Sequence, residues 1–248
     1  MDTDTNHKHR ELSEDGSKSH VRRAVIALLL LLPIPSLGTA CGMYWLEGTA
    51  IGQGLFFMSK IWILLLPLVW HLWVDKQKIS FSPMKREEIG KGLALAAVMG
   101  TVICAIIFGA YYGYAKDAVD LSLIKAKATE IGLDKPIFYI IAALYWITIN
   151  SVLEEYVWRW FVFKKFETFT GGKIAIILSA FFFTVHHFIA LASYFDVGLN
   201  LLCCFGIMVG GMSWSWLYLK YRSIWPGYLS HTMVDVAVFA IGYLLFFH

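Results

Sequence analysis

Two carboxylates and a guanidinium lie close together inside an apolar stretch of this sequence. They are Glu154, Glu155 and Arg159, within a hydrophobic run that begins near Pro136. A charged side chain in a membrane-length helix costs about 2.5 to 3.5 kcal/mol on insertion scales, so such residues usually have a specific role. The cluster therefore indicates a functional site, and the alternative is a structural polar cluster between packed helices.

Helical geometry divides these three charges into a pair and a single residue. Glu155 and Arg159 are four residues apart with the acid first, which is the favoured order for an ion pair within one helix. Glu154 points about 100° away around the helix, toward a different neighbour. We therefore predict that Glu155 and Arg159 are supporting residues, and that Glu154 is free to act as a base.

Two later apolar stretches carry histidines, which are uncommon in hydrocarbon. His186 and His187 are consecutive, so at most one of them is expected to face a given partner. His231 and Asp235 are four residues apart on one face, where the acid could orient a catalytic imidazole or simply form a local structural bond. Three polar stretches together favour a catalytic site over three separate structural histidines and acids.

Peptide hydrolysis would use this set of side chains. A carboxylate deprotonates a water molecule, and a histidine orients that water or protonates the leaving amine. Further donors stabilise the oxyanion.

Composition restricts the class of protein. The chain has 248 residues, of which 58% are hydrophobic and 16% charged, and this is too apolar for an ordinary soluble domain. We expect an integral, multi-pass protein whose partner is the lipid bilayer. The net charge of +3 is spread over loops, so nucleic acid is not an expected partner. The four cysteines fall in apolar segments without C-x-x-C spacing, which argues against a disulfide framework.

The hydrophobic segments predict an all-α, polytopic transmembrane bundle of about seven spans. Residues 1–22 are polar and are predicted to form a disordered tail. Residues 23–135 should hold three spans and an interfacial segment, either a short helix or a plain loop, and residues 136–248 should form a catalytic core of four transmembrane helices. The expected spans are residues 24–45, 50–74, 92–114, 136–163, 173–194, 197–219 and 226–247.

Flanking charges bear on the first two spans and on topology. The first span resembles a signal peptide, but we interpret it as a retained span because a long tail precedes its basic residues. Lys60 lies within the second span and is interpreted as a snorkelling side chain, although it could belong to a site. Basic residues favour the loops on the N-terminal side of the membrane, which predicts a cytoplasmic N-terminus. The basic segment 116–135 departs from this pattern.

Three motifs in this order are similar to those of a known family of intramembrane proteases, the CAAX-protease and bacteriocin-processing (CPBP, or Abi) family. The resemblance covers residues 151–235, and the motifs are Glu154-Glu155-x-x-x-Arg159, Phe183-x-x-x-His187 and His231-x-x-x-Asp235. Each motif alone would be weak, but the combination is specific. Phe182-x-x-x-His186 also fits the second motif, so His186 remains a substitute for His187.

The resemblance implies roles for these residues. Glu154 would activate the water with His187 as its partner, and His231 with residue 235 would help to hold the oxyanion. Family members often carry asparagine where this chain has Asp235, and an acid donates a hydrogen bond only when protonated, so an orienting bond to His231 is the simpler role. If a metal such as zinc is present, Glu154, His187 and His231 would be its ligands, but a ligating Glu154 would not be free as the base. We favour metal-independent chemistry over a metalloprotease.

The expected function is an intramembrane endopeptidase acting on a membrane-associated peptide or protein tail, in the plasma membrane of a bacterium. Prenylated CAAX tails, leader peptides and sorting signals all fit the resemblance. A proton-coupled transporter would also place acids and histidines within the membrane, but the chain shows no repeat symmetry. A non-catalytic immunity or scaffold protein that retains the site is the other alternative.

Overall fold

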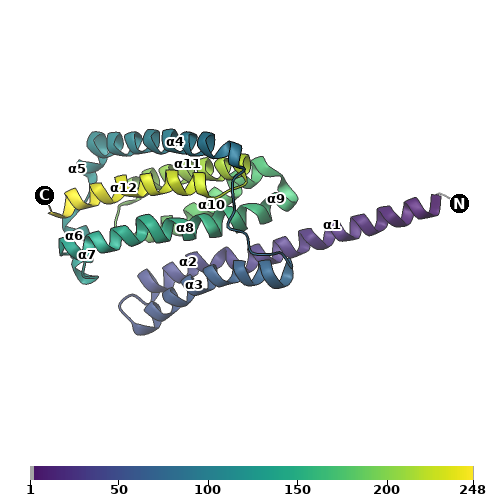
Figure 1. The fold of residues 1–248 in the computed structure, drawn as a ribbon. Helices are drawn as coiled ribbons and strands as arrows, with labels where there is room; N and C mark the ends of the chain where they lie inside the picture. The colour runs from purple at the N-terminus through teal and green to yellow at the C-terminus, as the bar shows by residue number, and fades with distance from the viewer. Residues whose placement is uncertain (1–2, 248) are drawn as a thin grey trace.

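The computed structural model of the chain describes residues 3–247, with the side chains of residue 16 and of residues 18–247. Every regular element in this range is helical, and seven helical segments are long and apolar enough to cross a membrane (Figure 1). This confirms the expected all-α bundle of about seven spans.

The first span is part of a longer helical segment than the sequence predicts. Helix α1 runs over Thr3–Leu31 and is followed by α2, Pro33–Ala40, and the π-helical turn Cys41–Trp45. The helical backbone therefore includes residues 3–22, where a disordered tail was predicted. No proline interrupts residues 3–22, so the helix of the first span can extend backward with one further backbone hydrogen bond per residue. The start of α1 projects well beyond the bundle (Figure 1).

The second span forms a hairpin with α2. It consists of α3, Ala50–Val69, and the π-helical segment Trp70–Val74. The Thr49 hydroxyl caps α3 by accepting a hydrogen bond from the Gly52 amide at 3.0 Å. This α2–α3 hairpin lies along one side of the remaining helices (Figure 1).

The third span packs on the last one. It runs over Arg86–Ala118 and contains α4, Ile89–Ala110, which lies along α12, Trp225–Phe247. A short helix, α6, Leu121–Glu130, follows in the segment where we expected an interfacial helix or a loop.

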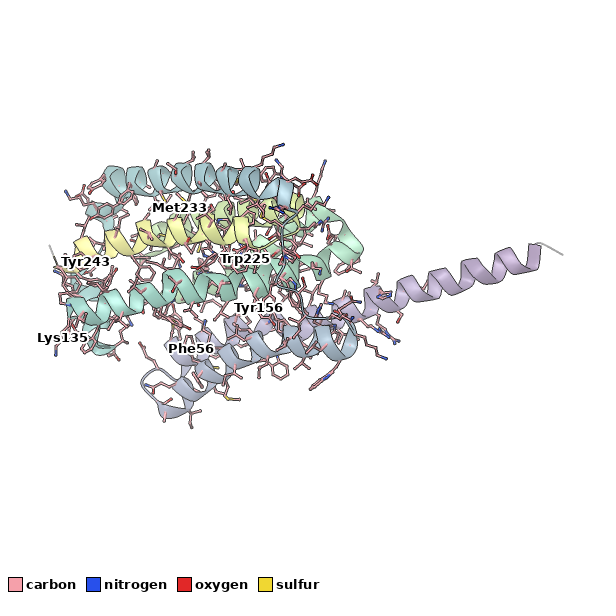
Figure 2. The ribbon with its side chains drawn as sticks, in the orientation of Figure 1. Phe56, Lys135, Tyr156, Trp225, Met233 and Tyr243 are labelled. Atoms are coloured by element: carbon pink, nitrogen blue, oxygen red, sulfur yellow. The ribbon has the colours of Figure 1, made fainter. Side chains whose placement is uncertain are left out.

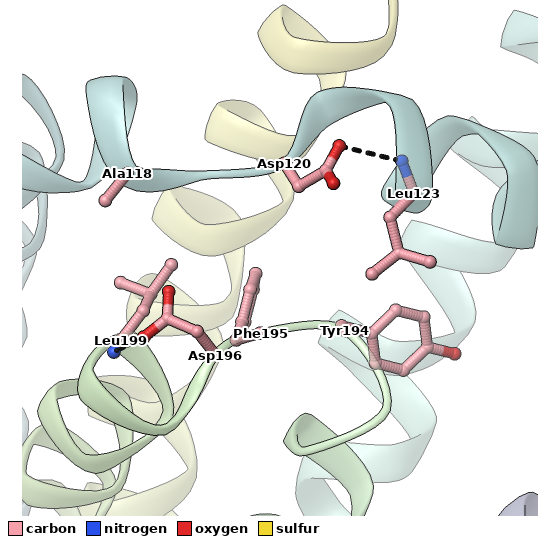
Figure 3. Close-up of a pocket in the computed structure, with 7 residues that line it drawn as sticks. All are labelled: Ala118, Asp120, Leu123, Tyr194, Phe195, Asp196 and Leu199. Carbon is pink, nitrogen blue, oxygen red and sulfur yellow. Dashed lines mark hydrogen bonds between the residues drawn. The ribbon is translucent and has the colours of Figure 1, made fainter.

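Two aspartates cap helices on either side of a pocket of about 220 Å³ at this end of the bundle (Figure 3). Asp120 accepts hydrogen bonds from the Ser122 and Leu123 amides at the start of α6. Its further bond from the Ser122 hydroxyl contributes most to lowering the pKa of the Asp120 carboxyl. Asp196 caps α11, Val197–Tyr221, in the same way. Each of the two carboxylates is thus the N-cap of the helix that follows it.

The fourth span alternates between α-helical and π-helical turns. It runs over Pro136–Thr170 and is seven residues longer than expected. Its elements are α7, Pro136–Leu144; π-helical Tyr145–Asn150; α8, Ser151–Glu154; π-helical Glu155–Phe163; and α9, Lys164–Thr170. Within the added turns, the Lys165 ammonium pairs with Asp75, which follows the second span. Gly171, with φ of 77°, then turns the chain into α10, Gly172–Leu191.

The core lies where the fourth span meets α10, α11 and α12. Its largest contributors are aromatic: Trp158, Phe161 and Phe163 of the fourth span are all about 2% exposed or less. They pack with Phe183 of α10 and Trp214 of α11. Figure 2 shows the side chains that fill the spaces between the helices, with Tyr156 on the edge of the fourth span toward the α2–α3 hairpin. This core surrounds the predicted site residues.

Candidate active site

A change of helix type occurs between the two glutamates of the first motif. Glu154 is the last residue of α8, and Glu155 is the first residue of the π-helical segment. Such π-helical insertions are frequently found at functional sites. The sequence predicted different neighbours for the two acids, but both of them approach His231.

Glu155 lies at the centre of a buried network. Its Oε1 atom is 3.1 Å from Arg159 Nη1, and both side chains are fully buried. This confirms the predicted pair, which is a close ion pair rather than an aligned hydrogen bond. The Arg159 guanidinium also lies over the rings of Phe183 and Trp214, at 4.8 and 5.0 Å from their centroids. Arg159 therefore neutralises Glu155 while the aromatic rings stabilise the cation.

The Glu155 carboxylate also orients His231 of α12. His231 Nδ1 lies 3.1 Å from Glu155 Oε1, and because a carboxylate accepts, Nδ1 carries the hydrogen. The opposite nitrogen, Nε2, then faces Glu154 Oε2 at 3.6 Å. Trp214 stacks on the imidazole with the ring centroids 3.9 Å apart. His231 is thus fixed between the two glutamates.

Asp235 has a different partner from the one that the sequence suggests. Its Oδ2 atom is 3.9 Å from His231 Nε2, too far for the expected orienting hydrogen bond. Instead, the buried Ser151 hydroxyl of α8 donates to Oδ2 at 2.6 Å. Spacing within one helix suggested His231 and Asp235 as a pair, but the packing of α12 against the fourth span places Glu155 closer to the imidazole.

Glu154 is the acid that remains accessible. Its side chain is 20% exposed, whereas Glu155 is fully buried. The Asn150 side chain donates to Glu154 Oε1 at 2.9 Å, which leaves Oε2 facing the His231 ring. One oxygen of this carboxylate is therefore held in place while the other faces the site.

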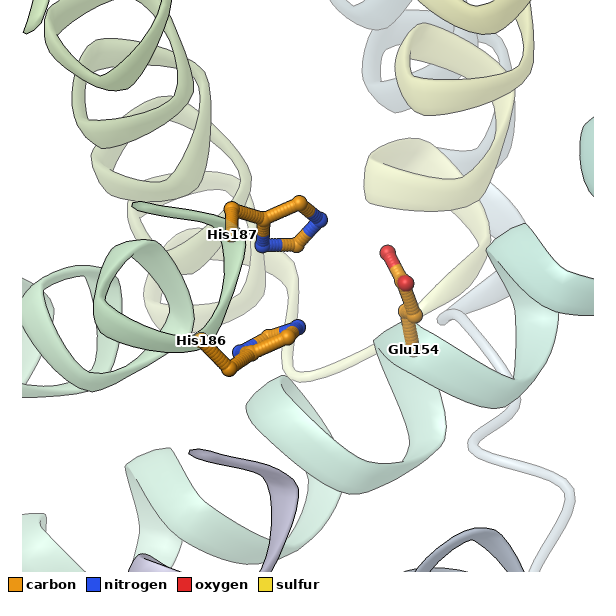
Figure 4. A group of neighbouring side chains, drawn as sticks. All are labelled: Glu154, His186 and His187. Carbon is orange, nitrogen blue, oxygen red and sulfur yellow. The ribbon is translucent and has the colours of Figure 1, made fainter. Parts of the chain in front are cut away.

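Both histidines of α10 approach Glu154, contrary to the expectation that at most one would do so. His187 Nδ1 donates to the Phe183 carbonyl at 2.8 Å, so its Nε2 carries the free lone pair. His186 is 8% exposed and stacks on Trp158 with the rings 5.3 Å apart. Figure 4 shows the two imidazoles facing the Glu154 carboxylate. The carboxylate lies opposite the boundary between the two histidine faces of α10, which explains why it meets both.

The residues that could hold a metal differ by one from the predicted set. Ligand atoms of Glu154, His186 and His187 all lie within 4.8 Å of one another, whereas the sequence suggested His231 in place of His186. Two imidazoles and one carboxylate are a donor set that zinc accepts, with a coordination position left for water. His186 Nδ1 makes no well-aligned hydrogen bond, although the Phe182 carbonyl is near it. The residues thus fit a zinc ion, but only if Glu154 serves as a ligand.

Sequence reasoning missed three residues of this site. Ser151 holds Asp235, Trp214 stacks on His231, and Asn150 binds Glu154. The last could have been found, because an amide four residues before a carboxylate is a favourable pair on one helix. Trp214 gives no such signal, since its contact depends on the packing of α11 against α12.

Comparison with known families gives one match. Residues 136–237 match the family model described as "Type II CAAX prenyl endopeptidase Rce1-like". The matched segment contains every predicted site residue, from Glu154 to Asp235. The match agrees with the resemblance drawn from the three motifs. No curated protein and no solved structure matches the chain significantly.

Proposed function

We propose that this chain, which residues 136–237 identify as a membrane endopeptidase of the Rce1-like type II CAAX family, hydrolyses a peptide bond near the C-terminus of a membrane-anchored substrate. One observation carries the proposal. Glu154 is accessible and faces the imidazoles of three histidines, while neighbouring Glu155 is buried and neutralised. Two adjacent acids with such different surroundings suit two different tasks.

In the proposed reaction, Glu154 removes a proton from a water molecule while the oxygen of that water bonds to the carbonyl carbon of the substrate. His187 Nε2 accepts the second water hydrogen and so orients the attack, because its Nδ1 is already committed to Phe183. His231, which carries a hydrogen on each ring nitrogen as an imidazolium between the two glutamates, donates from Nε2 to the developing oxyanion. The carbon–nitrogen bond then breaks, and Glu154 returns its proton to the leaving amine.

The supporting residues fix this arrangement before the substrate arrives. Glu155 holds the His231 ring through Nδ1, and Arg159 supplies the positive charge that allows Glu155 to stay buried. Ser151 holds Asp235 beside the same ring. Such preorganised partners avoid a cost of reorientation during the reaction.

A metal would alter this division of tasks. If zinc bound, Glu154, His186 and His187 would hold it, and the ion would polarise the carbonyl or the water. Glu154 would then lose its freedom to carry a proton. With Glu154 as the base, His187 therefore orients the water and does not act as a metal ligand.

Product analysis tests the proposed function. The purified chain in phosphatidylcholine vesicles is incubated with a peptide that carries an S-farnesyl cysteine four residues from its C-terminus, and the products are identified by mass spectrometry. We expect release of the last three residues. Cleavage at another position, or cleavage only of leader or sorting-signal peptides, would contradict the proposed CAAX-type substrate. Proton-linked solute flux without cleavage of any peptide would support a transporter instead.

A further inference from the structure

Lys60 is a cation at membrane depth whose role the proposed reaction does not explain. It lies ten residues after Ala50 and fourteen before Val74, the ends of the second span. At a rise of about 1.5 Å per residue, these ends are roughly 15 and 21 Å away. An ammonium at this depth is unfavourable unless it has a partner. Among the side chains that the structure describes, none forms an ion pair with Lys60, whose ammonium lies 5.1 Å from the Phe56 ring centroid.

Snorkelling does not remove this difficulty. A snorkelling lysine reaches the membrane interface by extending its stem along apolar surface. The four-carbon stem is shorter than the distance from Lys60 to either end of its span. The ammonium therefore remains within the bilayer.

The face of α3 that carries Lys60 meets the fourth span beside the active site. Leu64, one helical turn after Lys60 and on the same face, accepts a hydrogen bond from the Tyr156 hydroxyl at 3.1 Å. Tyr156 is two residues from Glu154. The Lys60 charge interacts electrostatically with Glu154 and with both histidines of α10. Lys60 is thus the free cation next to the site within the described part of the chain.

We propose that Lys60 is a specificity-determining residue that binds the free C-terminal carboxylate of the substrate. This inference rests on the proposed function, in which the bond cleaved lies three residues before the C-terminus. Three extended residues span about 10 Å. The axes of packed helices are roughly 8 to 10 Å apart. A tail of this length can reach from a scissile carbonyl at Glu154 on the fourth span to Lys60 on a packed neighbouring helix, α3.

The positive charge of Lys60 indicates an anionic ligand. A substrate that enters the bilayer with a free α-carboxylate brings an anion that also needs a partner, and an ammonium supplies both charge and hydrogen bonds. An anionic lipid headgroup has the same chemistry and could approach α3 from the bilayer. The two sources differ in one respect, because only the substrate carboxylate disappears when the peptide ends in an amide.

The test compares two forms of the farnesylated peptide, one with a free acid and one with a C-terminal amide. Hydrolysis of both is measured for the wild type, Lys60→Met and Lys60→Arg in vesicles of phosphatidylcholine. Lys91→Met is the matched control, because Lys91 is an exposed lysine in the third span. We expect the wild type to favour the acid by about tenfold in kcat/KM, as one charge-assisted contact provides. Lys60→Met should lose this preference through KM, whereas Lys60→Arg and Lys91→Met should keep it.

Other outcomes overturn the inference. If the wild type hydrolyses the acid and the amide equally, Lys60 does not bind the carboxylate. If Lys60→Met weakens hydrolysis of both peptides alike, and only in vesicles that contain phosphatidylglycerol, a lipid headgroup is the ligand. A loss in Lys60→Met that is equal for both peptides without anionic lipid would assign Lys60 a structural role.

A binding measurement separates this inference from the proposed function. Glu154→Gln and the double variant Glu154→Gln/Lys60→Met are titrated with the acid and amide peptides, which requires no hydrolysis. Tighter binding of the acid, lost on Lys60→Met, supports the carboxylate site even if the wild type cleaves neither peptide. Equal binding of acid and amide to Glu154→Gln contradicts it, whether or not the wild type is an endopeptidase.

Discussion

At the scale of single residues, the site depends on two adjacent glutamates that the fold places in opposite circumstances. Glu155 is fully buried against Arg159 and His231, whereas Glu154 keeps one oxygen directed toward the imidazoles. Glu155 therefore has a structural role, because its charge balances the buried guanidinium of Arg159. The accessible acid has its second oxygen available for a proton.

Replacing Glu155 should mainly affect stability. In Glu155→Gln, the buried Arg159 cation loses its counter-charge, and breaking one side of such a pair costs about 3 to 5 kcal/mol. We expect a large fall in the melting temperature of the protein in detergent, measured by tryptophan fluorescence. Glu167→Gln is the matched control, because Glu167 pairs with the half-exposed Arg222, and such pairs contribute about 0 to 1 kcal/mol. Equal melting temperatures for the two variants would contradict the structural role.

Metal ions should not be needed for hydrolysis, and zinc should inhibit it. A chelator is expected to leave the rate unchanged, because Glu154 and the histidines perform the proposed steps themselves. Added zinc should occupy Glu154, His186 and His187 and so remove the base. In His186→Phe, which keeps an aromatic ring against Trp158, the inhibition constant for zinc should rise by roughly tenfold or more. Loss of activity on chelation, restored by zinc, would show that the enzyme is a metalloprotease.

At the scale of helices, the site depends on how closely α12 approaches the fourth span. Gly227, in the first turn of α12, faces the Glu155 carboxylate so closely that a Cβ atom there would collide with Oε2. This approach brings His231, one turn further along α12, to the same carboxylate. The hydrogen bond that orients His231 thus requires a residue without a Cβ atom at position 227.

A pair of glycine substitutions tests this close approach. Gly227→Ala should destabilise the protein by about 1 to 3 kcal/mol, as overpacking does, and should reduce hydrolysis by displacing Glu155. Gly206→Ala in α11 should be neutral or stabilising by up to about 1 kcal/mol, because its added Cβ would meet no atom within 4 Å outside the local helix backbone and alanine favours the helix. Thermal melting and kcat measure the two effects. Similar behaviour of the two variants would contradict the account of α12 packing.

Local spacing predicted some of these contacts and not others. The Glu155–Arg159 pair follows from residues four apart on one helix, and it is present. The expected His231–Asp235 bond had the same spacing, but each residue has a nearer partner on another helix. Within one helix the sequence determines which side chains are neighbours, whereas contacts between spans depend on helix packing. Hydrophobic length predicted all seven spans for the same reason, since it is a property of each segment alone.

At the scale of the whole molecule, the chain divides its tasks between its two halves. The matched segment 136–237 provides all the predicted catalytic residues. The preceding spans add the α2–α3 hairpin, which contacts the fourth span beside the site through Leu64 and Tyr156. The N-terminal half is therefore positioned to influence which substrates reach Glu154.

Seven spans also predict the arrangement of the chain across the membrane. An odd number of crossings places the two ends of the bundle on opposite sides, and the basic loops favour a cytoplasmic N-terminus. A reporter active only in the cytoplasm should therefore work when fused before α1 and fail when fused after α12. Activity at both ends would require an even number of crossings and would contradict the seven-span arrangement.

The most direct test of the account is the rate of peptide hydrolysis by Glu154→Gln. The amide keeps the shape of the side chain but cannot accept a proton from water. We expect kcat to fall by roughly 10² to 10⁴, the usual contribution of a general base, while the melting temperature stays close to that of the wild type. Hydrolysis of the farnesylated peptide by Glu154→Gln at the wild-type rate would contradict the central claim that Glu154 activates the attacking water.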